Sequence, residues 1–346
     1  MATERLISPQ TRRPEEEQAN WALRPTRIGE YVGQRDLIER LSIAIAAGRS
    51  RQEPMEHVLL HGPPGLGKTT LAHVIANEMG GRLHVTSGPA LARGTDLVSA
   101  LTQLAQGDVL FIDEIHRLPV AVEEFIYPAM EDFRIDVTVD AGLQARTVQI
   151  RCKPFTLIGA TTRAGLLSSP LRSRFGLVHH LKYYEVPDLV TILGRSCELL
   201  KVEGAPAVAL ERIAARSRGT PRIANRLLRR VRDFTQVKHG GKMDLGVVDA
   251  ALALEGVDAL GLDELDRTYL RIIATTYDGG PVGLETVAAT MNEDAGTLED
   301  VVEPYLLQIG FLARTRRGRE LTRRACEHVG VAFKEKSEAV DLFNKP

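Results

Sequence analysis

Cysteine is scarce in this chain of 346 residues. The three cysteines, Cys152, Cys197 and Cys326, lie far apart and show neither the pairing of a disulfide-rich domain nor the close spacing of a metal site. This usage excludes a disulfide-stabilised secreted domain and predicts a protein of the reducing cytoplasm. The nine histidines do not supply a metal-ligand spacing either.

Long apolar runs and an excess charge of one sign are also lacking. No window reaches the apolar length of about 20 residues that a membrane-spanning helix needs, and the N-terminus has no signal-peptide core. The 44 Lys and Arg residues are balanced by 45 Asp and Glu residues, which excludes a general attraction to nucleic acid or membrane. A polyanion site therefore requires a local concentration of basic side chains, and arginines crowd residues 212–232 and 314–324. Apart from Arg222, the arginines of 212–232 are expected to be helix-surface or intersubunit charges.

The length favours two or three domains, and the first of them has an α/β pattern. Residues 1–20 are polar and predict a mobile arm. Between residues 21 and 182, the apolar runs 57–60, 109–112 and 156–160 alternate with helical patterns, which predicts a doubly wound parallel sheet. Residues 134–150 interrupt this rhythm with alternating apolar and polar side chains on both sides of a turn, and they predict a protruding hairpin.

The second half of the chain reads as two smaller domains. Residues 183–255 are helical in pattern without convincing strands, which predicts a small helical domain. A linker is expected at residues 256–261, and a winged helix-turn-helix over 256–346. The winged-helix prediction rests on three helical patterns followed by a short strand and a basic turn; the helices are expected at 265–277, 284–291 and 298–308, and the strand at 311–315.

A glycine-rich loop between a strand and a helix carries the strongest chemical signal. Glycines at this position let backbone N–H groups approach phosphate oxygens at the start of a helix, Lys68 contacts the β and γ phosphates, and Thr69 binds magnesium. The loop therefore predicts a site for a nucleoside triphosphate, ATP, with Mg²⁺. The predicted contacts from the loop are Gly62, Gly65, Leu66, Gly67, Lys68, Thr69 and Thr70.

Two carboxylates follow the apolar run 109–112. Open α/β sheets bind ligands at the carboxyl ends of their strands, so Asp113 and Glu114 are expected beside the phosphate loop. We assign Asp113 to the magnesium shell and Glu114 to the attacking water.

With these two elements the chain resembles the AAA+ ATPases, and the resemblance implies further site residues. Residues 156–162 look like sensor 1, in which Thr162, or alternatively Thr161, contacts the γ-phosphate or the water. Residues 169–175 resemble the arginine-finger motif, in which Arg174 reaches the nucleotide of the neighbouring subunit. Residues 219–222 look like sensor 2, which places Arg222 over the nucleotide from the lid.

Within the AAA+ family, the chain is most similar to the motors that drive branch migration of Holliday junctions. The similarity covers nearly the whole chain after the arm; it is carried by residues 23–25, 31–34, 61–70, 157–165, 219–226 and 310–319. It implies an ATP-driven DNA translocase in recombination and repair, assembled as a hexameric ring of identical subunits. It also implies nucleotide contacts, with the adenine lined by Leu23, Arg24 and Tyr184 and with Glu131, Asp132 and Phe133 nearby.

The same resemblance implies the partners. The hairpin 134–150 corresponds to an arm that docks a junction-binding protein, although an apolar tip residue such as Leu143 could instead fold back onto its own domain. Arg314 and Arg319 correspond to wing contacts with the backbone of double-stranded DNA. A junction resolvase is a further partner that the resemblance suggests. A DNA contact that the family places at residues 292–295 is not carried over, because Glu293 and Asp294 make this segment acidic.

Two other functions compete with the motor. One is a nucleotide-switched DNA-binding regulator or clamp-loader-like protein, which uses ATP to change state and does not translocate. The other is a protein unfoldase, which is disfavoured because the sequence has no aromatic pore-loop motif between the phosphate loop and Asp113.

Overall fold

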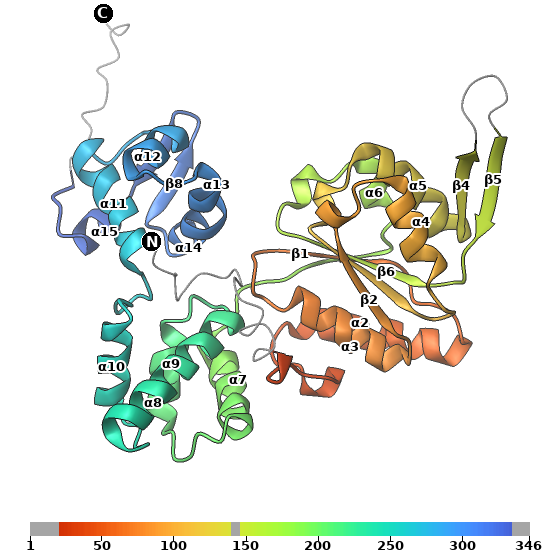
Figure 1. The fold of residues 1–346 in the computed structure, drawn as a ribbon. Coiled ribbons are helices and arrows are strands. Elements are labelled where there is room, and N and C mark those ends of the chain that lie inside the picture. Colours follow the sequence, from red (N-terminus) through yellow and green to blue (C-terminus); the bar gives the residue numbers. More distant parts are fainter. Residues whose placement is uncertain (1–20, 140–145, 334–346) are drawn as a thin grey trace, which may run out of the picture. The chain divides into compact units, whose positions relative to one another are not determined.

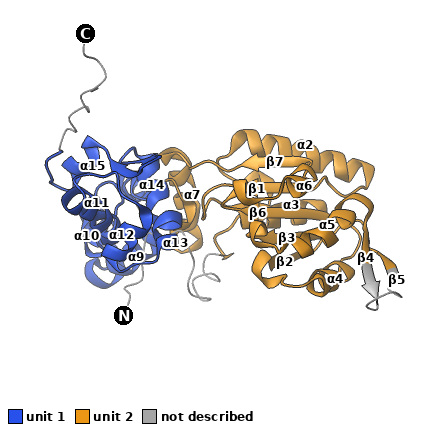
Figure 2. Cartoon of the chain, turned by 90° about the horizontal axis from the view of Figure 1, so that it is seen from above, with its two compact units in different colours: residues 1–10, 204–218, 226–346 blue, residues 11–203, 219–225 orange. Residues whose placement is uncertain are grey.

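The computed structural model describes residues 21–139 and 146–333. The predicted arm, residues 1–20, and the hairpin tip with Leu143 lie outside these ranges. Within the described residues, 21–203 and 219–225 form one compact unit, here called the sheet unit, and 204–218 and 226–333 form a second, here called the helical unit (Figure 2). This division runs through the small helical domain expected at 183–255, so its first helix belongs to the sheet unit.

The sheet unit is built on five parallel strands in the order β2-β3-β6-β1-β7. Three of them coincide with the predicted buried runs. The two outer strands, β2 and β7, were not predicted, because their residues are largely half-buried or exposed and include polar side chains. The strands are β1 (Val58–His61), β2 (Leu83–Ser87), β3 (Val109–Asp113), β6 (Thr156–Thr161) and β7 (Leu177–His180).

Helices cover both faces of this sheet (Figure 1). One face carries α2 and α3, and the other carries α4, α5 and α6; their bounds are α2 (Arg35–Arg51), α3 (Lys68–Met79), α4 (Gly94–Thr102), α5 (Val120–Asp132) and α6 (Ser169–Ser173). The core under α4 and α5 includes Leu97, Leu110, Ile126 and Phe155, which are almost completely buried. This is the doubly wound α/β architecture that the alternating pattern predicted.

The predicted hairpin is present. Strands β4 (Arg134–Val139) and β5 (Arg146–Arg151) pair antiparallel and form their own two-stranded sheet. Ile135 is opposite Ile150 and is fully buried in the core of the sheet unit, so the base of the hairpin is anchored in the domain.

The last helix of the first stretch of the sheet unit is α7 (Val186–Leu199), and the chain then enters the helical unit. The first helices there are α8 (Ala207–Ala215), α9 (Pro221–His239, which begins in the sheet unit) and α10 (Leu245–Leu254). The winged-helix elements follow as α11 (Glu264–Thr276), α12 (Leu284–Met291), α13 (Ala295–Thr297), the π-helical turn η5 (Leu298–Val302), α14 (Glu303–Gln308), β8 (Leu312–Thr315), β9 (Gly318–Leu321) and α15 (Arg323–His328). None of the helices in the described ranges is long and apolar enough to span a membrane.

The expected linker at residues 256–261 is an ordered turn held by polar contacts. The Asp258 carboxylate accepts hydrogen bonds from the backbone N–H groups of Leu260 (2.9 Å) and Leu262 (2.8 Å), and its second oxygen lies 2.8 Å from Nε2 of His328. Beside it, the buried Arg218 guanidinium pairs with the fully buried carboxylate of Asp266. These contacts fix the loop within the helical unit.

We expect Asp266→Ala to lower the free energy of unfolding of the helical unit by about 3–5 kcal/mol, because it leaves the buried Arg218 charge without this partner. Denaturant unfolding followed by circular dichroism measures the change. Glu264→Ala, on the exposed side of the same helix, is the matched control and should change stability by less than about 1 kcal/mol. Equal effects of the two substitutions would contradict a structural role for the buried pair.

Candidate functional site

The phosphate loop links the end of β1 to the start of α3, as the sequence predicted. Two of its glycines have backbone conformations and surroundings that exclude a side chain. Gly62 has φ 139°, and a Cβ atom there would lie 2.6 Å from the carbonyl oxygen of Leu181. Gly67 has φ 102° at the N-cap of α3, and a Cβ there would lie 2.6 Å from the hydroxyl of Tyr31. The loop thus keeps its backbone open at the start of a helix, where N–H groups favour an anion.

Lys68 is held inside this loop. Its side chain is 8% exposed, and Nζ donates hydrogen bonds to the carbonyl oxygens of Gly62 (2.8 Å) and Pro63 (2.9 Å). Burial lowers the pKa of Lys68 to about 8, the nearby Asp113 opposes this shift, and the Arg222 charge adds to it. Lys68 and two other predicted site residues, Asp113 and Arg222, therefore share one electrostatic environment.

The strand order explains why Asp113 and Glu114 lie near the loop. Strand β6 separates β3 from β1, and the parallel register brings the carboxyl ends of all three to one edge. Glu114 adopts a left-handed conformation (φ 47°) directly after β3. Its backbone N–H donates to the Asp113 carboxylate (3.0 Å), and its own carboxylate accepts from Arg117 (2.9 Å) in an exposed ion pair. Asp113 is thus the last residue of β3 and Glu114 follows it directly, at the edge of the sheet that carries the phosphate loop.

The two threonines at the end of β6 have different surroundings. Thr161 is buried, and its hydroxyl lies 2.9 Å from Nδ1 of His116 and accepts from the backbone N–H of Arg163 (3.0 Å). Thr162 is exposed beyond the strand. Thr161 thus has a structural task, which favours Thr162 as the sensor. His116 was not among the predicted site residues, because a single histidine two residues after Glu114 gives no signal in the sequence.

Of the residues expected around adenine, Tyr184 lies beside the loop. Tyr184 is 8% exposed, and its hydroxyl lies 3.0 Å from that of Tyr31 and 3.4 Å from the carbonyl oxygen of Leu66. Burial raises the pKa of Tyr184 to about 12, so this phenol stays protonated at neutral pH. Leu23 is buried, and the Arg24 guanidinium lies over the ring of Trp21 at 3.9 Å. Tyr31 completes this group, although the sequence analysis did not name it as a site residue.

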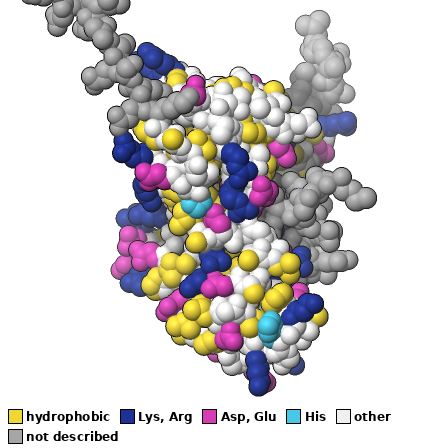
Figure 3. All heavy atoms as spheres, turned by 90° about the vertical axis from the view of Figure 1, so that its left-hand side faces the viewer, with side chains coloured by type: hydrophobic (Ala, Val, Ile, Leu, Met, Phe, Trp, Pro, Cys, Tyr) yellow, Lys and Arg dark blue, Asp and Glu magenta, His cyan; other side chains and the backbone are white. Residues whose placement is uncertain are grey.

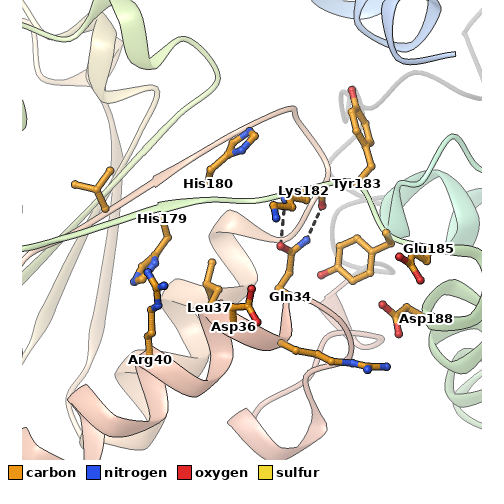
Figure 4. Close-up of a pocket in the computed structure, with 13 residues that line it drawn as sticks. Gln34, Asp36, Leu37, Arg40, His179, His180, Lys182, Tyr183, Glu185 and Asp188 are labelled. Atoms are coloured by element: carbon orange, nitrogen blue, oxygen red, sulfur yellow. Dashed lines mark hydrogen bonds between the residues drawn. The ribbon is translucent and has the colours of Figure 1, made fainter. Parts of the chain in front are cut away.

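A pocket of about 470 Å³ opens beside Tyr184, between the start of α2 and the end of β7 (Figure 4). The Gln34 side chain lines this pocket and binds the backbone of Lys182. Its Nε2 donates to the Lys182 carbonyl oxygen (2.5 Å), and its Oε1 accepts from the Lys182 N–H (3.1 Å). His179 and Arg40 lie at its other end. Its lining includes Tyr184 but, among the described residues, none from the phosphate loop.

Arg174 and Glu131 form a second group, on α6 and α5. These helices cover the face of the sheet opposite α3 (Figure 1). Nε of Arg174 lies 3.0 Å from Oε1 of Glu131, and the guanidinium lies over the ring of Tyr127 at 4.2 Å. Asp132 pairs with Arg134 (3.3 Å), and Phe133 packs against Phe155. The predicted nucleotide-site residues thus form two groups. The loop group comprises the phosphate loop with Lys68, Asp113, Glu114, Thr162, Tyr184 and Arg222. The Arg174 group comprises Arg174, Glu131, Asp132 and Phe133.

In the wing, Arg314 and Arg319 are opposite each other on β8 and β9. Both bind the fully buried carboxylate of Glu303, through Nε at 2.8 Å for Arg314 and at 2.9 Å for Arg319. Tyr269 donates a third hydrogen bond to this carboxylate (2.7 Å). Glu303 therefore fixes both predicted DNA contacts from inside the domain, and Arg314 remains 41% exposed.

The arginines of residues 212–232 include several ion pairs. Arg212 and Arg216 share the Asp249 carboxylate at 2.6 and 2.7 Å, and Arg232 pairs with Asp233. On the face shown in Figure 3, acidic side chains lie among the Lys and Arg side chains. Arg216, Arg218 and Arg226 are buried, so the interpretation as helix-surface charge is wrong for these three.

The lowered pKa of Lys68 predicts a pH-dependent affinity for ADP. Above about pH 8 the free lysine loses its proton, whereas bound phosphates favour the charged form, so binding takes up a proton. We expect the affinity for ADP in EDTA to fall about tenfold per pH unit above pH 8, measured by calorimetry. Lys68→Arg keeps a cation that does not titrate in this range. The affinity of this variant for ADP should be weaker and should not change with pH. A level wild-type profile would contradict the prediction.

Comparisons with known proteins assign the chain to a family. Three family profiles match successive parts of it: the Holliday junction DNA helicase RuvB P-loop domain at residues 23–181, the RuvB AAA lid domain at 184–258 and the RuvB C-terminal winged helix domain at 259–330. The Holliday junction branch migration complex subunit RuvB of Desulfosudis oleivorans is 54% identical over 330 residues, which are 94% of this chain and 96% of that protein.

Solved structures agree with this assignment. The Thermotoga maritima RuvB Holliday junction branch migration motor is 50% identical, with a TM-score of 0.82 over 90% of this chain and 99% of that one. A single-substitution variant of the same protein gives a TM-score of 0.83 over 89% of this chain and 99% of that one. The parallel sheet, the lid helices and the winged helix all have counterparts in these proteins. The chain therefore belongs to the RuvB family of P-loop AAA+ ATPases.

Proposed function

We propose that this chain is an ATP-driven motor that moves Holliday junctions by branch migration, in recombination and in the repair of damaged DNA, including the SOS response. The observation that carries the proposal is the phosphate loop with its buried Lys68, in a chain matched along its length by RuvB family profiles. Such work on the bacterial chromosome takes place in the cytoplasm.

ATP binds on the loop group. Lys68 contacts the β and γ phosphates, and the adenine lies near Leu23, Arg24 and Tyr184. Arg222 senses the nucleotide from the start of α9, and its electrostatic effect on Lys68 supports this role. The remaining loop contacts are Gly62, Gly65, Leu66, Gly67, Thr69 and Thr70. Glu131, Asp132 and Phe133, at the end of α5, belong to the Arg174 group and lie near the nucleotide that Arg174 reaches.

The Thr69 hydroxyl and the Asp113 carboxylate fit a magnesium site. In the part of the chain that the structure describes, no cluster of three or more His, Cys, Asp or Glu residues could hold a metal. Mg²⁺ commonly binds through one or two protein oxygens together with substrate phosphates, and the Asp113 charge acts directly on Lys68. When bound, the ion would neutralise charge on the phosphates.

Glu114 and Thr162 act on the water that attacks the γ-phosphate. Glu114 orients and polarises this water, and Thr162 contacts the γ-phosphate or the water from the end of β6. The position of Glu114 directly after β3, at the sheet edge that carries the phosphate loop, supports this role.

Arg174 completes the site of a neighbouring subunit. Its guanidinium contacts Glu131 and Tyr127 on α5, the helix on the face of the sheet opposite α3, and this supports a site shared between subunits. Such an arginine stabilises transition-state charge. Sites shared in this way close into a ring, which we propose is a hexamer.

The partners are double-stranded DNA and junction-processing proteins. The wing, with Arg314 and Arg319, contacts the DNA backbone, which suits a motor that moves over any sequence. The hairpin β4–β5 docks a junction-binding protein of the RuvA type, and a resolvase of the RuvC type is a further partner.

Replacing Glu114 with Gln should stop junction movement while leaving nucleotide bound. The carboxamide cannot polarise water as a carboxylate does, so we expect hydrolysis of ATP to fall by at least about a hundredfold. Nucleotide binding should persist. The measurement is movement of a four-way junction with ATP and a RuvA-type protein, followed by gel electrophoresis.

Arg117→Ala, which removes the exposed ion pair of Glu114, is the control and should retain most of the activity. Junction movement by Glu114→Gln at the normal rate would contradict the proposal. Hydrolysis by the unmodified protein without any junction movement would favour the nucleotide-switched regulator.

Arg314→Ala should weaken binding of duplex DNA and lower the slope of log affinity against log salt by about one, because one phosphate contact is lost. Fluorescence anisotropy at several salt concentrations measures both quantities. Arg271→Ala removes an exposed arginine from α11 and should leave the slope unchanged. An unchanged slope for Arg314→Ala would exclude this side chain as a phosphate contact.

A further inference from the structure

The Arg174 guanidinium rests on a platform built by its own chain. It lies 4.2 Å from the centre of the Tyr127 ring, a cation–π distance, and its Nη1 donates to the carbonyl oxygen of Pro170 at 2.7 Å. Its side chain is only 23% exposed. Most directions in which a long arginine could point are therefore closed before a neighbouring subunit arrives.

Tyr127 is itself fixed by a buried acid. Its hydroxyl donates to the Glu123 carboxylate at 2.9 Å, and Glu123 is 6% exposed. Burial raises the pKa of Tyr127, so the hydroxyl keeps the proton that it donates.

The same carboxylate also holds the start of α6. The Ser168 hydroxyl donates to Glu123 at 2.5 Å and caps α6 by accepting from the backbone N–H of Leu171. Arg174 is the residue that ends this helix. Glu123 on α5 thus binds both the Tyr127 side chain, whose ring lies under the guanidinium, and the start of α6, the helix that ends at Arg174.

We propose that Tyr127 is a positioning residue for the arginine finger: its ring, locked by Glu123, aims Arg174 at the nucleotide of the neighbouring subunit. This inference rests on the proposed role of Arg174. The ring supplies a face for the guanidinium and forms no bond to the nucleotide. In the single chain the Glu131 carboxylate lies 3.0 Å from Arg174. When the γ-phosphate of the neighbouring subunit is within reach, it replaces Glu131 as the partner of the guanidinium.

Rings mixed from two defective subunits test the proposal. Arg174→Ala subunits keep a phosphate loop, and Lys68→Ala subunits keep an arginine finger, so hydrolysis in the mixture comes from sites that combine the two. Tyr127→Leu is then added to the Lys68→Ala subunit in one mixture and to the Arg174→Ala subunit in another. The steady-state rate and the KM for ATP are measured in each.

We expect Tyr127→Leu to lower the recovered rate by about ten- to a hundredfold when it is on the finger-bearing subunit, because misplaced catalytic groups lose rate in this range. The KM should change little. The same substitution on the subunit without the finger should leave the recovered rate within about twofold. Tyr127→Phe, which keeps the ring, should retain more of the rate than Tyr127→Leu on the finger-bearing subunit.

Three outcomes would overturn the proposal. Equal losses on the two subunits would indicate a general structural effect, which the thermal midpoint of each variant also monitors. Full recovery with Tyr127→Leu on the finger-bearing subunit would show that Arg174 needs no platform. A mixture of Arg174→Ala and Lys68→Ala that recovers no hydrolysis, even with Tyr127 intact, would instead reject the shared site itself.

Discussion

The parallel pairing of β6 with both β1 and β3 is the constraint on which the site depends. Parallel strands end at the same edge of a sheet, so this pairing brings the phosphate loop, Asp113 and Thr162 together from segments far apart in the sequence. The close approach of Gly62 to the backbone of Leu181 joins β7 to the same edge. Without this strand order, the loop would remain a glycine-rich turn with no acidic residues beside it.

The buried Lys68 is held by hydrogen bonds within its own loop. Its ammonium group donates hydrogen bonds to two carbonyl oxygens of the same loop. Burial destabilises the charged form and so lowers the pKa of Lys68. Arg174 likewise has partners in its own chain, because its guanidinium lies over the Tyr127 ring and beside the Glu131 carboxylate. Both cations thus have local partners in the single chain, and phosphates are stronger partners that can replace them. This arrangement favours an enzyme whose charges are placed before the substrate arrives.

Much of the fold and of the loop group could be predicted from the sequence. The inner strands are continuous apolar runs because both of their faces are buried, and such runs are easy to recognise. Strands β2 and β7 escaped prediction because they lie at the edges of the sheet, where exposed and polar side chains break the pattern. The hairpin and the first two winged-helix helices followed their periodicity closely.

Side-chain partners could not be predicted in the same way. Glu303 and Glu123 look like ordinary helical glutamates in the sequence, yet both are buried and organise basic or hydroxyl groups around them. The contact between Thr161 and His116 could not be predicted either, because it joins the ends of two different strands. These contacts join distant segments, and no local spacing records them.

The central claim is that a single chain holds only part of an active site. The most direct test is the rate of ATP hydrolysis per subunit over a wide range of protein concentration, with assembly followed in parallel by sedimentation. The account predicts that hydrolysis per subunit falls on dilution with the same midpoint as the loss of assemblies. A rate per subunit that stays constant while the assemblies dissociate would contradict it.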